Sequence, residues 1–170
     1  MTSTWVISGD ADHPGSTLVD DLRAGDRRRV VVVPDQERVA AGAVDEAVAG
    51  FGRIDVLVSC VGPLSEDPID GIALDGLERQ MAASLWGTIR LVRAALPVMQ
   101  AQGGGHIIAV LAGASGAAGA YRTASAAVAA YMEALAEAVR PAGIAVTIVE
   151  TGGPAAVAPA EALVRLAAMR

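Results

Sequence analysis

Short apolar runs rich in valine, isoleucine and leucine recur along the chain at regular intervals. They predict buried strands over residues 5–7, 28–33, 54–58, 107–111 and 144–149. Runs that are apolar at nearly every position are typical of a parallel sheet covered on both faces.

Between these runs the apolar residues follow helical spacing. They predict a helix that begins at Pro14 and ends near Gly25, and further helices over about 36–50, 77–102, 121–139 and 159–169. Strands that alternate with helices, without repeats or a linker, predict a doubly wound α/β fold with a parallel sheet. The whole chain, residues 1–170, is expected to form this single domain.

The composition narrows the classes of function. The 170 residues are 53% hydrophobic and only 19% charged, which argues against disorder. The net charge of -6 argues against nucleic acid as a main partner. The lone cysteine, Cys60, fits a reducing cytoplasm, and its place in an apolar run predicts a buried, inert thiol. No apolar stretch reaches the roughly 18 residues of a membrane span, and no signal pattern is found. We therefore expect a cytoplasmic protein without a membrane segment.

Five short motifs stand in a characteristic order along the chain. They are FGRIDVLV at 51–58, SCVG at 59–62, SLWGT at 84–88, GHII at 105–108 and YRTAS at 121–125. Together they resemble the short-chain dehydrogenase/reductase family from Trp5 to Leu166, which implies a Rossmann-like fold. Members of the family are longer than this chain. One strand of this chain, 28–33, stands where the family has two strands, and the family's last strand and substrate-covering segment are not found in this sequence. We therefore expect a Rossmann-like sheet that is truncated relative to the family.

The resemblance implies hydride transfer between a nicotinamide and a carbonyl or alcohol, with a tyrosine as the proton donor. Tyr121 matches that tyrosine, but Ser125 stands at the position of the family's lysine, and the chain contains no lysine or asparagine at all. Ser84 stands at the position of the asparagine, the serine position falls near Ala112, and Ser115 is the nearest hydroxyl. A tyrosine with its usual pKa of about 10 needs a nearby cation to titrate near neutrality. We therefore interpret Tyr121 as an amphipathic residue at a helix start rather than a working acid.

The segment that would hold the cofactor departs from the family as well. His13 replaces the middle glycine of the family's glycine-rich loop, and Asp10 and Asp12 add negative charge where a diphosphate would lie. Asp35 could contact a ribose, although a helix cap is the simpler interpretation. The cofactor-contacting positions implied by the resemblance are Gly9, His13, Gly15, Asp35 and Gly62. We expect no bound cofactor or, if one binds, NADP or NAD.

Other chemistries find little support. His13 and His106 lack ligand-like spacing with each other or with Cys60, so we expect no metal. No Gly-x-Ser-x-Gly motif is present to place a hydrolase nucleophile.

Three functions stay open. The first is a non-catalytic structural or regulatory subunit that forms a homo-oligomer, or a heteromer with an intact family member, through helices 77–102 and 121–139. The second is an NAD(P)-dependent reductase in which Tyr121 donates the proton unaided. The third is a non-redox small-molecule binder or cyclase that uses the cleft at the carboxyl ends of the strands.

Overall fold

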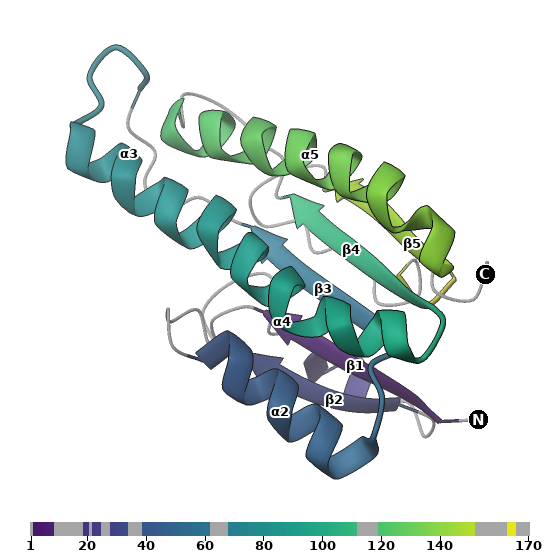
Figure 1. Cartoon of the computed structure of the whole chain (residues 1–170). Coiled ribbons are helices and arrows are strands. Elements are labelled where there is room, and N and C mark those ends of the chain that lie inside the picture. Colours follow the sequence, from purple (N-terminus) through teal and green to yellow (C-terminus); the bar gives the residue numbers. More distant parts are fainter. Residues whose placement is uncertain are drawn as a thin grey trace.

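The computed structural model describes residues 2–8, 19–20, 22–24, 28–33, 39–61, 68–111, 119–151 and 163–165 (Figure 1). Its centre is a five-stranded sheet in the order β2-β1-β3-β4-β5, with every neighbouring pair parallel. The strands are β1 (Ser3–Ser8), β2 (Arg28–Val33), β3 (Val56–Val61), β4 (Gly105–Leu111) and β5 (Ile144–Glu150). All five predicted strands are confirmed, and the doubly wound, Rossmann-like α/β fold with them.

The helices also follow the predicted order. They are α2 (Val39–Phe51), α3 (Leu74–Met81), α4 (Gly87–Ala101) and α5 (Gly119–Val139), with a π-helical segment η1 (Ala82–Trp86) and a short 3-10 turn η2 (Arg140–Ala142). The single helix predicted over 77–102 is therefore wrong in detail, because α3, η1 and α4 together fill that range. A π segment inserts one residue into the helical phase, which the apolar pattern does not reveal.

Two hydrophobic cores cover the two faces of the sheet. On the near face in Figure 1, α2, α4 and α5 pack their apolar side chains over residues such as Val6, Leu57 and Ile107. On the other face, Val19, Leu22 and Leu163 pack against Trp5 and its neighbours. Helical residues on both faces are the expected result of right-handed crossovers between parallel strands.

A buried carboxylate ties the amino ends of three strands together. Asp55 accepts a hydrogen bond from the main-chain nitrogen of Thr4 at 2.9 Å and pairs with the Arg53 guanidinium at 2.6 Å. Its own main-chain nitrogen donates to the carbonyl of Thr4, and its carbonyl accepts from the nitrogen of His106. Asp55 thus fixes β1, β3 and β4 side by side just before β3 begins. The predicted strand over 54–58 is therefore shifted, since Ile54 and Asp55 precede it.

Two further expectations need correction. Cys60 is only partly buried, although its neighbours in β3, Ser59 and Val61, are buried. Tyr121 is not the first residue of its helix, because α5 begins at Gly119. Among the described residues, no helix is both long enough and apolar enough to cross a membrane.

Candidate functional site

The parallel strands end along one edge of the sheet, and Tyr121 lies there. Open α/β sheets bind ligands at the carboxyl ends of their strands. The Tyr121 hydroxyl donates a hydrogen bond to the carbonyl of Val61, the last residue of β3, at 3.2 Å. Tyr121 is only 1% exposed and belongs to the core. The side chain that the sequence singled out therefore reaches the expected edge, with its hydroxyl directed at the main chain of β3.

A close backbone contact positions the first turn of α5. A Cβ atom on Gly119 would lie 2.6 Å from the Cα of Ile69 and 2.7 Å from its nitrogen. Only glycine permits the turn at 68–71 to approach the helix so closely. This contact helps to place Tyr121, two residues further along α5, against β3.

Ser125 lies one helical turn after Tyr121, at the position implied for a lysine. Its hydroxyl donates to the carbonyl of Arg122 at 3.2 Å, within its own helix. A serine side chain carries no charge and is too short to reach across a cleft as a lysine does. The position four residues after the tyrosine therefore supplies no cation to lower the pKa of a hydroxyl.

Ser84 belongs to a chain of buried polar side chains that runs from the α3 helix to the sheet. Gln80 Nε2 donates to Ser84 Oγ at 2.7 Å, and Thr88 Oγ1 donates to the carbonyl of Ser84 at 2.7 Å. Thr88 Oγ1 also lies 2.8 Å from Ser59 Oγ, and since its own proton goes to Ser84, Ser59 is the donor. All four residues are at most 3% exposed. The serine at the asparagine position is thus part of a satisfied internal network centred on the π segment.

The sequence-based prediction missed three members of this chain, and a signal was present for two of them, Gln80 and Thr88. Gln80, Ser84 and Thr88 stand four residues apart, so they share one face of a helix that is otherwise apolar there. Polar residues repeated at that spacing on a buried face need partners, and a buried network supplies them. Ser59, in the middle of β3, carries no such signal.

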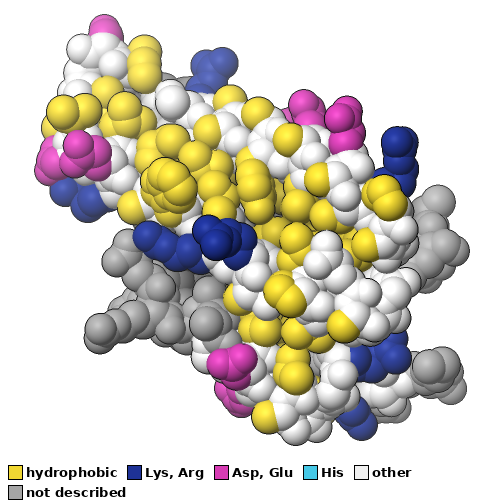
Figure 2. Space-filling view, viewed as in Figure 1, with side chains coloured by type: hydrophobic (Ala, Val, Ile, Leu, Met, Phe, Trp, Pro, Cys, Tyr) yellow, Lys and Arg dark blue, Asp and Glu magenta, His cyan; other side chains and the backbone are white. Residues whose placement is uncertain are grey.

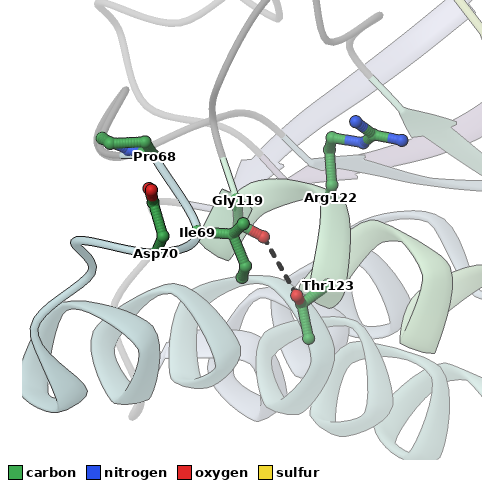
Figure 3. Close-up of a pocket in the computed structure, with 6 residues that line it drawn as sticks. All are labelled: Pro68, Ile69, Asp70, Gly119, Arg122 and Thr123. Atoms are coloured by element: carbon green, nitrogen blue, oxygen red, sulfur yellow. Dashed lines mark hydrogen bonds between the residues drawn. The ribbon is translucent and has the colours of Figure 1, made fainter.

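A pocket of about 590 Å³ lies beside the start of α5 (Figure 3). Its lining residues are Pro68, Ile69, Asp70, Gly119, Arg122 and Thr123. Thr123 Oγ1 donates back to the carbonyl of Gly119 at 3.0 Å, and Arg122 forms no ion pair with another described side chain. Figure 3 shows Asp70 and Arg122 directed to different sides of the pocket. Tyr121 does not line it, so the pocket and the tyrosine hydroxyl are separate features.

Six of the predicted site residues lie outside the described residues. They are Gly9, His13, Gly15, Asp35, Gly62 and Ser115. Tyr121, Ser84 and Ser125 all lie among the described residues, but no hydrogen bond joins any two of them. Among the described residues, no group of three or more potential metal-ligating side chains comes together.

The resemblance implies a lysine that holds the ribose of a nicotinamide cofactor. Ser125 stands at the position implied for it and bonds to its own helix, and the chain contains no lysine. The residues that the structure describes therefore do not reproduce the family's arrangement for this cofactor.

Comparison with known proteins identifies the relatives of this fold. The family model described as short chain dehydrogenase matches residues 4–162. The oxidoreductase BOA17 of Botryotinia fuckeliana is 36% identical over 183 residues, which cover 90% of this chain and 66% of that protein. An L-rhamnose 1-dehydrogenase (NAD(P)(+)) of a Sphingomonas species is 33% identical over 103 residues, which cover 59% of this chain and 41% of that protein. The chain thus spans at most about two thirds of the length of these two relatives.

Solved structures show the same fold. A metagenomic short-chain oxidoreductase in complex with NADP superposes with a TM-score of 0.79 at 20% identity, over 99% of this chain and 91% of that one. A short-chain dehydrogenase from Streptomyces avermitilis gives a TM-score of 0.76 at 24% identity, over 90% of this chain and 66% of that one. At these identities the likeness concerns the fold alone.

Proposed function

This chain belongs to the short-chain dehydrogenase family, and we propose that within it the chain is a non-catalytic member that acts as a structural or regulatory subunit. The observation that carries the proposal is the surroundings of Tyr121. Its hydroxyl proton is donated to the carbonyl of Val61, its side chain is buried, and the residue one turn later is a serine bonded to its own helix. A proton donor must instead reach a substrate and have its pKa tuned by a neighbouring charge.

The asparagine position supports the same proposal. Ser84 Oγ accepts a hydrogen bond from Gln80, and both side chains are buried. A hydroxyl held in this way stabilises the packing of α3 and η1 on the sheet. It offers no polar group to a relay at the edge of the sheet.

An apolar surface supports the role of a subunit. Figure 2 shows hydrophobic side chains gathered over the face formed by α3, α4 and α5. We call the part of it around η1 the association face; its residues are Leu85, Trp86, Ile89, Ala127 and Tyr131, all at least partly exposed. Trp86 is 51% exposed, which is unusual for so large an apolar side chain. Exposed apolar patches of this kind mark surfaces that bind another protein.

The titration of one tyrosine reports on the same face. Partial burial raises the pKa of Tyr131, and the positive charge of Arg93 lowers it to a smaller extent. Tyr131 therefore lies between solvent and the apolar surface, beside a cation from α4. This mixture of an aromatic ring and an arginine is typical of protein interfaces.

Two experiments test the proposal. The purified chain is incubated with NADH or NADPH and a panel of aldehydes and ketones, with Tyr121→Phe as the control. Turnover that depends on Tyr121 would contradict the proposal that the chain is non-catalytic.

Sedimentation analysis then follows association: we expect an oligomer, alone or with an intact relative, that Trp86→Glu dissociates. A chain that stays monomeric and binds no relative would remove the support for a subunit role.

One specific observation favours a second candidate, an NAD(P)-dependent oxidoreductase. The tyrosine of the family motif is retained at Tyr121, in a chain that the model of the short chain dehydrogenase family matches over residues 4–162. Calorimetric titration with NADPH to millimolar concentration separates the two candidates. Saturable binding supports the oxidoreductase, whereas the absence of heat rejects it.

A third candidate, a small-molecule binder, rests on the pocket beside Arg122. A ligand that occupies it would raise the unfolding temperature without any cofactor. The Arg122→Gln variant would then lose that stabilisation.

A further inference from the structure

The helical stretch from Leu74 to Ala101 changes its register once, at the π segment η1 between α3 and α4 (Figure 1). The main-chain nitrogen of Gly87 donates to the carbonyls of Ala82 and Ser84. Ala82 lies five residues back, whereas an α-helix would use the carbonyl four residues back, that of Ala83. One residue is thereby inserted, and all of α3 is displaced by one position relative to the helical phase of α4.

The buried chain of polar side chains depends on this insertion. An α-helix turns by about 100° per residue, so eight residues without interruption would place Gln80 and Thr88 about 80° apart around the axis. With one residue inserted, the phase is that of seven residues, and the two side chains lie within about 20° of each other. Ser84 joins them, because it accepts from Gln80 Nε2 through its hydroxyl and from Thr88 Oγ1 through its carbonyl. The π register is thus the one that aligns the polar chain.

The helices on the two sides of η1 are held unequally. In α3, one residue is buried, the polar Gln80, and the side chain of Leu74 is 70% exposed. No side chain of the N-cap residue, Ala73, bonds to the start of α3. In α4, five residues are buried: Thr88, Leu91, Val92, Ala95 and Met99. Because elements with few buried apolar contacts move at the lowest free-energy cost, α4 is the fixed part and α3 the movable one.

The residue after Gln80 offers a different side chain for the same buried place. Met81 is only partly buried in this structure. Removing the insertion would turn α3 by about 100° and carry it about 1.5 Å along its axis, which brings Met81 to the place that Gln80 holds. Methionine is unbranched and fills apolar gaps of irregular shape, and its burial is favourable. The segment before α3 would gain one residue of length, so no connection is stretched by the step.

We propose that α3 is a two-register device. In the register of this structure, η1 is π-helical and Gln80 is buried and bonded to Ser84. In the second register the helix is α-helical throughout, Met81 occupies the buried place, and Gln80 leaves it. The step turns a different set of α3 side chains toward α5, against which α3 packs, while α4 and the sheet stay in place.

The hydrogen bond between Gln80 and Ser84 decides between the two registers. It satisfies an amide group that is 1% exposed, and a buried amide that loses its acceptor is costly. The chain is anchored at its other end, since Ser59 of β3 donates to Thr88 of the fixed helix at 2.8 Å. Weakening the bond to Ser84 therefore leaves α4 in place and favours the register that buries Met81.

Nuclear magnetic resonance on the full chain tests the proposal, because scalar couplings across hydrogen bonds identify the carbonyl that accepts from the amide of Gly87. The acceptor is Ala82 in the π register and Ala83 in the all-α register. Two variants should release α3: Ser84→Ala removes the hydroxyl that accepts from Gln80, and Gln80→Ala empties the buried place. The matched control combines Ser84→Ala with Gln80→Leu, which makes the buried place apolar without a step.

We expect the ratio of the all-α to the π register to rise at least tenfold in each releasing variant and to return to that of the unaltered chain in the control. The methyl group of Met81 gives a second readout, since a soluble gadolinium chelate should broaden its resonance in the π register and much less in the all-α register. If Ala82 stays the acceptor in every releasing variant with native circular dichroism, the proposal is overturned. A switch to Ala83 that persists in the control also overturns it, because the occupant of the buried place would then not set the register.

Discussion

Removing the carboxylate of Asp55 tests how the strands are fixed at their amino ends. In Asp55→Ala, the main-chain nitrogen of Thr4, a residue with no exposed surface, loses its charged acceptor. Such a loss costs about 1.5–3 kcal/mol. The pair with Arg53 adds about 0–1 kcal/mol, because that guanidinium is 43% exposed and screened by solvent. The expected decrease in the free energy of unfolding is therefore about 1.5–4 kcal/mol.

The Asp55→Asn variant is the matched control. The amide oxygen can still accept from the nitrogen of Thr4, so only the charge is lost, at a cost of about 1 kcal/mol. Urea denaturation followed by circular dichroism measures both variants. With a slope of about 2 kcal/mol per molar urea, the midpoint should fall by about 0.8–2 M for alanine and by about 0.5 M for asparagine. An alanine variant no less stable than the asparagine variant would refute the reasoning.

Two further predictions follow from single contacts. Gly119→Ala should lower the free energy of unfolding by about 1–3 kcal/mol, because its Cβ would collide with the main chain of Ile69. In the control, Gly42→Ala, the new Cβ meets nothing within 4 Å, so the change should stabilise α2 by about 0.5–1 kcal/mol. Thermal unfolding compares the two variants, and equal effects on stability would contradict the close contact at Gly119. Arg93→Gln should raise the pKa of Tyr131 further, because it removes the positive charge that opposes the effect of burial. Ultraviolet titration of the phenolate measures that pKa. A pKa that falls in the variant would be inconsistent with the structure.

Much of the fold could be predicted from the sequence because the signals are local. Runs of β-branched residues marked every strand, and glycines near 103 ended α4, where Gly103 has a positive φ of 75°. The ends of strands were less certain. Ile54 belongs to the same apolar run as β3, but the strand itself begins only at Val56. Between them, the carboxylate of Asp55 accepts a hydrogen bond from the main-chain nitrogen of Thr4.

The candidate site could be predicted only in part. The motif located Tyr121, but its burial and its bond to Val61 depend on how α5 packs against β3, which no local pattern encodes. The π segment could not be predicted, because inserting one residue into the helical phase does not change the kinds of residue in the helix. The buried chain around Ser84 is completed by Ser59, which lies on a strand distant in the sequence and could not be predicted from the helix alone.

The relation to intact relatives gives these features a functional meaning. The chain contains no lysine or asparagine, and it has the sheet, the helices and the apolar face around Trp86.

Direct detection of hydride transfer tests the central claim, that this chain does not catalyse the reaction of its family. The chain is incubated with NADPH carrying deuterium at C4 of the nicotinamide and a mixture of carbonyl compounds, and the alcohols are analysed by mass spectrometry beside a Tyr121→Phe control. We expect no deuterated alcohol above the level found without protein. Deuterated alcohol formed by the unaltered chain and absent with Tyr121→Phe would contradict it.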